Sequence, residues 1–150
     1  MSVALDTNQI FDVLNNDEFS SNIFKSVHSI DQLPNNIVYP SAYVINNKGS
    51  NHPGEHWLSV YYNNEGEAYF FDSFARGPYT YGLGKFLAKT STKFKYNTTQ
   101  IQSIFSEYCG YYCIYFILLC CRGIRPEEFL KFLFNKKLFL NDYRIKHLLI

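Results

Sequence analysis

Several residue patterns are missing from this sequence, and each absence excludes a class of protein. With 5 prolines and 8 glycines among 150 residues, the chain is neither collagen-like nor a flexible linker. The most apolar stretch, residues 111–121, is shorter than the roughly 20 residues that span a bilayer, so we expect no membrane association. The first residues carry acids where a signal peptide needs basic residues and a long apolar run, which predicts a protein that is not exported.

Cysteine is missing before position 109 and then occurs four times in one apolar segment, at Cys109, Cys113, Cys120 and Cys121. Secreted scaffolds spread their cysteines along the chain to link distant loops, and this cluster does not. The pattern therefore favours free thiols in a reducing, intracellular compartment. Cys113 follows Cys109 by about one helical turn, but no His or second Cys pair accompanies them, so we expect no metal site.

The residues that are present are typical of a folded domain. Hydrophobic residues make up 47% of the chain and charged residues 18%, a balance too apolar for intrinsic disorder. Aromatic residues reach 19% and supply many large side chains for a core. A chain of this length is expected to build one core, so we predict a single domain over residues 1–150 and a monomer.

The formal net charge of +1 conceals two opposite halves. Residues 1–75 contain 2 Lys and Arg against 9 Asp and Glu, a charge of −7, whereas residues 76–150 contain 12 against 4, a charge of +8. The basic residues could form a face that holds DNA phosphates without sequence specificity. The alternative, which we favour, is that the basic half folds against the acidic half. The residues concerned are Lys85, Lys89, Lys93, Lys95, Lys131, Lys136, Lys137, Arg144 and Lys146.

The order of the predicted elements indicates an α+β fold. A first helix is expected with Thr7 as its cap and Ile10, Phe11 and Leu14 on one side, followed by a short turn over residues 17–24. Strands are expected at residues 37–45, 56–62, 67–73 and 93–97, with a polar turn at 46–54 and a hairpin turn at Asn63 to Gly66. Helices are expected at residues 85–89, from Cys109 to Gly123, from Pro126 with Phe129, Leu130, Leu133 and Phe134 inward, and at 141–149. The helix from Cys109 is apolar on nearly every face, so we expect it to be buried against a small mixed sheet.

A cysteine, a histidine, an acid and a glutamine lie where predicted elements begin or end. Cys109 begins the buried helix, whose dipole favours the thiolate that nucleophilic attack requires. His56 opens one hairpin strand and Asp72 ends the other, so antiparallel pairing brings a base together with the acid that orients it. Gln102 lies in the loop before Cys109, where its amide could join the Cys109 backbone N–H in an oxyanion hole. Gly110 would let a substrate approach closely.

Each of these residues also has an ordinary structural explanation. Cys109 could be core packing, and Asp72 could end its strand in an Asx turn. His56 could be a satisfied strand-end histidine, and Gln102 could be an exposed loop residue. A purely structural interpretation needs all four explanations to hold together, although the four positions form one working geometry. Among the other histidines, His52 is the only serious substitute for His56, and its Asn-Pro setting argues against it.

Three segments together resemble the adenovirus protease (adenain) family of cysteine peptidases. They are Gly54-Glu-His-Trp-Leu-Ser-Val, Tyr69-Phe-Phe-Asp-Ser-Phe, and Ser106-Glu-Tyr-Cys-Gly-Tyr-Tyr-Cys with Gln102 before it. Proteases of this type also occur in Polinton/Maverick transposons, and they share a clan with the SUMO-specific proteases. The resemblance covers residues 5–123. It implies an adenain-like fold, a nucleophile at Cys109, a base at His56, an orienting acid at Asp72 and an oxyanion donor at Gln102.

The resemblance also implies a substrate and a biological role. Trp57 matches the tryptophan that, in SUMO proteases, narrows the cleft until only glycine passes, which implies cleavage after Gly-containing sites; a core aromatic of the hairpin is the alternative. The implied substrates are polypeptide precursors of virion proteins, processed in the host nucleus or cytoplasm and in the virion. An isopeptidase acting on ubiquitin-like modifiers, or an inactive relative that binds protein or DNA, are the alternatives.

An activator is implied as well. Family resemblance makes DNA and a peptide the candidate activators, and no other cofactor is expected. Because no cysteine precedes Cys109, we expect no activator tethered by a disulfide.

Overall fold

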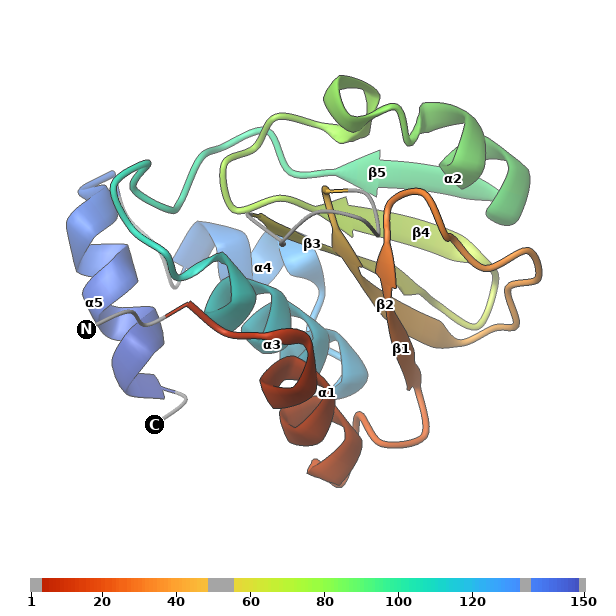
Figure 1. Cartoon of the computed structure of the whole chain (residues 1–150), viewed down its shortest axis with the longest axis horizontal. Coiled ribbons are helices and arrows are strands. Elements are labelled where there is room, and N and C mark those ends of the chain that lie inside the picture. Colours follow the sequence, from red (N-terminus) through yellow and green to blue (C-terminus); the bar gives the residue numbers. More distant parts are fainter. Residues whose placement is uncertain (1–3, 49–55, 133–135, 149–150) are drawn as a thin grey trace.

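The computed structural model describes residues 4–48, 56–132 and 136–148 and confirms the predicted α+β class (Figure 1). Its sheet has the strand order β1-β2-β3-β4-β5. The strands are β1 (Phe24–Ser29), β2 (Ser41–Asn46), β3 (Trp57–Tyr62), β4 (Glu67–Phe71) and β5 (Lys93–Tyr96). The helices are α1 (Thr7–Asn16), α2 (Gly84–Thr90), α3 (Cys109–Cys121), α4 (Pro126–Phe132) and α5 (Leu138–Leu148), with a 3-10 turn, η1 (Pro78–Tyr81).

The sheet is mixed, with three antiparallel strands flanked by a parallel strand on each side. β2 pairs with β3 and β3 with β4 in antiparallel fashion, while β1 runs parallel to β2 and β5 parallel to β4. The β3–β4 hairpin is confirmed, with Tyr62 opposite Ala68 and Ser59 opposite Phe71. Its turn is closed by the Gly66 N–H, which donates to the Asn63 carbonyl at 3.0 Å. His56 and Asp72 therefore leave the paired strands at the same end of the hairpin.

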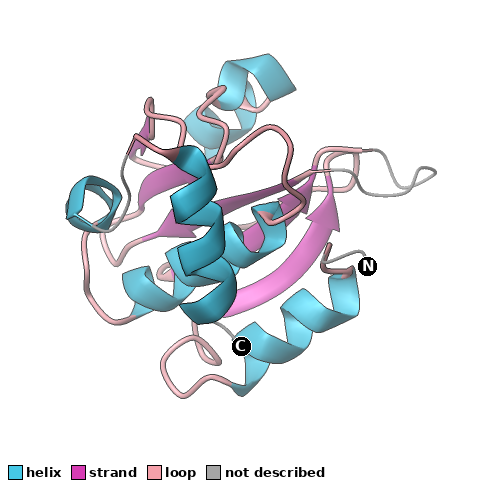
Figure 2. Ribbon diagram, turned by 90° about the vertical axis from the view of Figure 1, so that its left-hand side faces the viewer, coloured by secondary structure: helices cyan, strands magenta, loops and turns pink. Residues whose placement is uncertain are grey.

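Both faces of the sheet carry buried side chains. Successive side chains of a strand point to opposite faces, so alternate residues of one strand contribute to different apolar clusters. In β2, Ala42 and Val44 join the cluster around α3, whereas Tyr43 and Ile45 join a second cluster with Leu87 of α2. Figures 1 and 2 show α1 and α3 on one side of the sheet, and Figure 1 shows α2 beside β5 at its far edge. The sheet is thus a central layer between helices.

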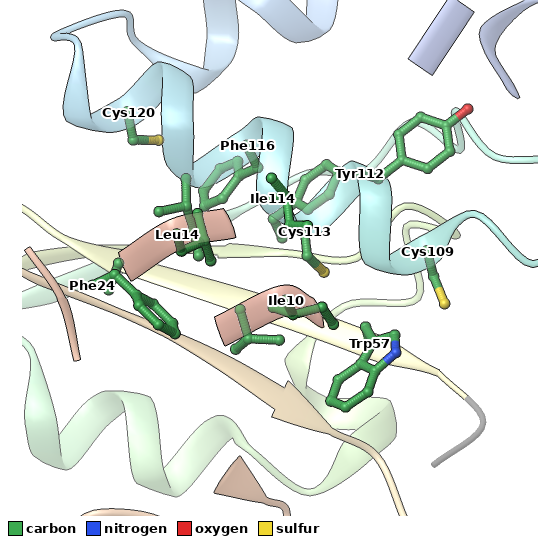
Figure 3. Packing of buried hydrophobic residues seen from close by; sticks show 14 of the residues in the cluster. Ile10, Leu14, Phe24, Trp57, Cys109, Tyr112, Cys113, Ile114, Phe116 and Cys120 are labelled. Carbon is green, nitrogen blue, oxygen red and sulfur yellow. The ribbon is translucent and has the colours of Figure 1, made fainter. Parts of the chain in front are cut away.

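Helix α3 is the centre of the first cluster, as its continuous apolar sequence predicts. Phe116 is fully buried and stacks on Phe71 of β4, with ring centroids 4.8 Å apart and planes 6° apart. Ile10 and Leu14 of α1 reach the same cluster (Figure 3), and both are 0% exposed. Burying side chains of this size contributes on the order of 1.5–3 kcal/mol each, so α3 is held firmly where it begins at Cys109.

The predicted cap of α1 is wrong by one residue. Asp6, not Thr7, is the cap: its Oδ1 accepts from the Gln9 N–H at 2.8 Å, while Gln9 Oε1 accepts from the Asp6 N–H at 2.9 Å. This reciprocal pair satisfies two backbone donors at once, which a threonine one position later could not do. Phe11, predicted to face inward, is 38% exposed, although its ring meets Phe24 edge-on at 5.8 Å.

Two predicted boundaries and one missing strand also need correction. The strand predicted at residues 37–45 begins only at Ser41, directly after Pro40, which has no N–H to donate to a ladder. β1 was not predicted, because its sequence has no clear alternation and it forms by pairing with β2. α5 begins at Leu138 rather than 141. Most of the predicted polar turn at 46–54, and the side chains of Leu133 and Phe134, lie outside the described residues.

Candidate active site

His56 and Asp72 meet at the open end of the β3–β4 hairpin, as the sequence predicts. His56 directly precedes β3 and Asp72 directly follows β4. His56 Nε2 lies 2.6 Å from Asp72 Oδ1, and the two residues are 5% and 0% exposed. A hydrogen bond this short between buried partners fixes the plane and the direction of the imidazole.

Asp72 is surrounded by donors. Besides the imidazole, its carboxylate accepts from the Phe74 N–H at 2.9 Å, the Arg76 N–H at 3.1 Å and the Tyr81 hydroxyl at 2.6 Å. Burial alone would raise the pKa of Asp72, but the bond from His56 and its positive charge, followed by Tyr81 and Phe74, lower it below the usual value. Asp72 is therefore an ionised acceptor that can stabilise a protonated imidazole.

The imidazole of His56 packs against aromatic rings, and one of its nitrogens has no hydrogen-bond partner among the described residues. Phe74 stacks on it with ring centroids 4.5 Å apart and 21° between the planes, and the centroid of the Tyr81 ring is 6.3 Å away. Nδ1 is buried and makes no hydrogen bond to a described atom, although the ring lies within interaction range of Cys109. Burial lowers the pKa of His56, but the interactions with Asp72 and Cys109 outweigh it and raise this pKa to about 9.

Cys109 is the first residue of α3 and is 6% exposed. Figure 3 shows the Cys109 side chain at the start of α3. Tyr108, which precedes it, caps the helix with no side-chain hydrogen bond. Cys109 thus lies at a helix N-terminus and within interaction range of the His56 imidazole. The structure brings His56, Asp72 and Cys109 together at one place in the fold.

The other three cysteines have environments that suppress reactivity. Burial raises the pKa of Cys113 and of Cys120 well above the usual value, and it raises that of Cys121 to about 12. All four cysteines are free thiols. Only Cys109 combines a helix N-terminus with a neighbouring imidazole.

Gln102 is brought to the site, but its amide is turned to other partners. It is fully buried, and its Oε1 accepts from the Ser73 hydroxyl, next to Asp72. Its Nε2 donates to the Ser106 carbonyl at 3.1 Å and to the Ser106 hydroxyl at 3.0 Å. Gln102 is therefore not the exposed loop residue of the structural alternative. To donate to a substrate oxyanion, it would have to exchange Ser106 for the substrate.

Trp57 and Gly110 pack against each other and against the N-terminal segment. Trp57 is 6% exposed, and its indole N–H donates to the Leu5 carbonyl at 3.0 Å. A Cβ placed on Gly110 would lie 3.2 Å from Leu5 Cβ and 3.3 Å from Trp57 Cδ1. The absent side chain of Gly110 thus allows α3 to approach Trp57 and Leu5. The substrate-binding roles of Trp57 and Gly110 stay predictions.

Sequence reasoning missed the residues that hold the acid. Tyr81 lies in η1, nine positions after Asp72, and nothing in its turn-rich segment marks it. Asn97, which follows β5, clamps the Asp72 backbone: its Oδ1 accepts from the Asp72 N–H at 3.0 Å and its Nδ2 donates to the Asp72 carbonyl at 2.6 Å. A buried, hydrogen-bonded asparagine after a strand is recognisable only from the fold, because its partner is 25 residues away.

Comparison with known proteins finds a weak structural likeness and no matching family. No model of a known protein family matches the chain, and no curated protein does. Among solved structures, eight chains match. One is the selenomethionine crystal structure of ASFV pS273R protease, aligned over 61% of this chain and 38% of that chain, at 19% identity and a TM-score of 0.41. The alignment therefore spans well under half of that protease. A likeness of this strength carries no functional argument, so function rests on the site itself.

In the part of the chain that the structure describes, no three His, Cys, Asp or Glu side chains come together as metal ligands. Across those same residues, no helix has both the length and the apolar character to cross a bilayer. His28 and His147 bond to the carbonyls of Gln32 and Tyr143 rather than to acids. His52 lies outside the described residues.

Proposed function

We propose that this protein is a cysteine peptidase with Cys109 as nucleophile, His56 as its base and Asp72 as the orienting acid. The observation that carries the proposal is the imidazole of His56. Its Nε2 is bonded to a buried carboxylate at 2.6 Å, while its Nδ1 is left unbonded within range of a cysteine at a helix N-terminus. The large majority of buried polar side-chain atoms are hydrogen-bonded, so an imidazole nitrogen left without a partner beside a cysteine favours a chemical role.

The proposed chemistry follows from the charges at the site. With a pKa of about 9, His56 is protonated at neutral pH and stabilises a Cys109 thiolate. The thiolate attacks the scissile carbonyl carbon, and the Cys109 N–H, joined by the Gln102 amide once it leaves Ser106, holds the oxyanion. His56 gives its proton to the leaving amine and a thioester forms. Water, deprotonated by His56, then hydrolyses the thioester and frees Cys109.

Substrate and biological role belong to the proposal at a finer level. We propose polypeptide substrates cut after Gly-containing sites, by resemblance of the His56-Trp57 segment to proteases with a narrow glycine tunnel. Maturation of viral or transposon virion precursors is the role that this resemblance favours. A protease for ubiquitin-like modifiers is separated from it by substrate: cleavage of Gly-Gly-containing precursor peptides without cleavage of a ubiquitin or SUMO fusion supports maturation, and the reverse supports the modifier protease.

Iodoacetamide labelling followed by peptide mapping tests the nucleophile. At pH 7 we expect Cys109 to be alkylated at least about tenfold faster than Cys113, Cys120 and Cys121, whose thiols are raised in pKa by burial. His56→Ala should slow alkylation of Cys109 by about tenfold or more. Slow and equal labelling of all four cysteines would contradict the proposal.

Hydrolysis of a peptide library tests the reaction. Cys109→Ala should abolish cleavage, while the matched variant Cys121→Ala, at the far end of α3, should retain it. Cleavage that persists in Cys109→Ala would rule out this site.

A further inference from the structure

The last helix presents two buried polar side chains to the loop that carries Gln102. Asn141 and Asp142 of α5 are 1% and 5% exposed. Asn141 Nδ2 donates to the Ile101 carbonyl at 3.0 Å. The Asp142 carboxylate accepts from the Ser103 N–H, at 3.4 Å to Oδ1 and 3.3 Å to Oδ2. These bonds hold the backbone on both sides of Gln102.

Helix α3 joins the same network through Tyr112. This side chain is 1% exposed and lies three residues after Cys109. Its hydroxyl lies 2.7 Å from Asp142 Oδ1 and 3.3 Å from the Ile101 carbonyl. α5 therefore connects the helix that begins with Cys109 to the loop that contains Gln102.

The opposite side of the loop is fixed by the residue that follows Asp72. The Ser73 carbonyl accepts from the Ile101 N–H at 3.0 Å and from the Gln102 N–H at 3.1 Å. The Ser73 hydroxyl donates to Gln102 Oε1. Gln102 thus lies between the β4 end and α5, and removing either support would leave it held from one side only.

Burying a carboxylate and an amide in this position carries a cost that packing alone would not require. A buried polar group is unfavourable unless it is hydrogen-bonded, and an apolar side chain would fill the same space without that cost. Burial indeed raises the pKa of Asp142 despite the bonds from Tyr112, Ser103 and Ser106. What these side chains supply, and apolar ones could not, is a fixed position for the backbone of residues 101–103.

We propose that Asn141 and Asp142 are positioning residues, which set the place of the Gln102 amide relative to the Cys109 backbone N–H. This proposal rests on the proposed peptidase function. An oxyanion donor acts only at hydrogen-bond distance from the developing charge, and a displacement of about 1 Å can cost on the order of 100-fold in rate. On this account α5 supports the proposed oxyanion donor through the loop of residues 101–103.

Asp142→Asn is the test, because it keeps the shape and replaces one acceptor oxygen by an NH2 group that opposes a donor. We expect kcat for peptide hydrolysis to fall about tenfold, with KM within about twofold of the wild type. The iodoacetamide rate of Cys109 should stay within about twofold, because alkylation needs the thiolate and not the oxyanion donor. The matched control Glu128→Gln, at an exposed position of α4 whose carboxylate pairs with Arg125, should match the wild type in all three measurements.

Two kinetic outcomes would overturn the proposal: unchanged kcat in Asp142→Asn, or equal losses in alkylation and hydrolysis, which would indicate general disruption of the site. If Asp142→Asn does not fold, Tyr112→Phe removes the hydroxyl that bonds to Asp142 and should show the same split between kcat and alkylation.

The side-chain amide resonances of Gln102 in a ¹⁵N-labelled protein separate this proposal from the peptidase function. They should shift in Asp142→Asn and not in Glu128→Gln, whether or not the wild type cleaves any peptide. A wild type without activity but with this shift contradicts the peptidase function alone. Unmoved Gln102 resonances contradict the positioning role alone.

Discussion

Tyr81 shows how much of the site depends on single residues outside the predicted constellation. Its hydroxyl donates to Asp72 Oδ2 at 2.6 Å, and its ring lies over that of His56. Burial, followed by the bond to Asp72, raises the pKa of Tyr81, so it remains a neutral donor. It bonds to Oδ2 of the carboxylate, whereas the imidazole bonds to Oδ1.

Tyr81→Phe should therefore remove one hydrogen-bond donor from the Asp72 carboxylate while the aromatic ring still fills the same space. We expect a loss of about 1–2 kcal/mol in the free energy of unfolding, measured in urea, because a buried carboxylate loses one donor. Alkylation of Cys109 should slow several-fold. Tyr79→Phe, at a neighbouring tyrosine that is 65% exposed, is the control. Equal behaviour of the two variants would argue against a role for the Tyr81 hydroxyl.

The raised pKa of His56 predicts a dependence of stability on pH. In the unfolded chain this group titrates near 6.5, and in the folded protein near 9. Its contribution is therefore fully present below pH 6.5 and is lost as the pH rises through about 9; we expect a loss on the order of 1–3 kcal/mol. Urea unfolding at pH 6 and pH 9.5 measures it. His56→Gln should flatten this part of the profile, and a slope that survives the substitution would assign the effect to other groups.

At the scale of elements, the β3–β4 hairpin is set by its turn. Gly66 has φ of 78°, and a Cβ there would lie 2.4 Å from Tyr39 Cε2. Tyr39 is in turn tied by its hydroxyl to the Thr90 carbonyl at 2.6 Å, so its ring has little freedom to move away. The turn of the hairpin that pairs His56 with Asp72 is thus also held in place by packing against the Tyr39 ring.

A pair of glycine substitutions separates backbone strain from steric overlap. Gly123, at the end of α3, has a similar φ of 81°, but no atom lies within 4 Å of its Cβ position. Gly123→Ala should cost about 1–2 kcal/mol of unfolding free energy from the left-handed backbone alone. Gly66→Ala should cost more, because the Tyr39 ring must also move. If the two variants lose equal free energy of unfolding, measured by heat or urea, then the Tyr39 ring moves aside at no cost.

The elements divide according to how local their causes are. The hairpin, α3 and α4 were predictable, because turn residues, apolar continuity and an initial proline act within a few positions. β1 was not, since its half-buried residues become a strand only beside β2. The cap of α1 shows a finer limit: Asp6 and Thr7 are both acceptable caps, and the reach of Gln9 decides between them.

For the whole molecule, the sheet separates two apolar clusters, one around α3 and one around α2. If the chain is a single domain, as its length predicts, the two must unfold together. Phe116→Ala in the first cluster should cost about 3–5 kcal/mol, and Leu87→Ala in the second about 2–5 kcal/mol.

The single tryptophan, Trp57, lies in the first cluster and provides the measurement. In each variant, the unfolding transition followed by Trp57 fluorescence and the one followed by far-ultraviolet circular dichroism should shift by the same amount. If Leu87→Ala leaves the Trp57 transition in place, the clusters are independent and the prediction of one domain is wrong.

The charge halves meet in part across the fold. Lys93 pairs with Glu67 at 2.7 Å and Arg122 with Asp17 at 2.6 Å, each joining the basic half to the acidic half. These contacts favour the explanation in which the halves fold against each other. Binding of DNA stays a proposal, and affinity that falls steeply as salt is raised would support phosphate contacts.

The sequence by itself determined which chemical groups are available and at which ends of strands and helices they lie. An antiparallel hairpin must bring residues just outside its strands together, so His56 and Asp72 could be paired from their positions, and an apolar helix beginning at Cys109 had to enter the core. Only the tertiary structure decided what each group faces. It turned the Gln102 amide to Ser106, placed Tyr81 and Asn97 on Asp72, covered Trp57 with Leu5, and brought α5 to the loop before Cys109. These contacts join residues from separate elements, and side-chain hydrogen bonds of that kind leave no periodic signal in the chain.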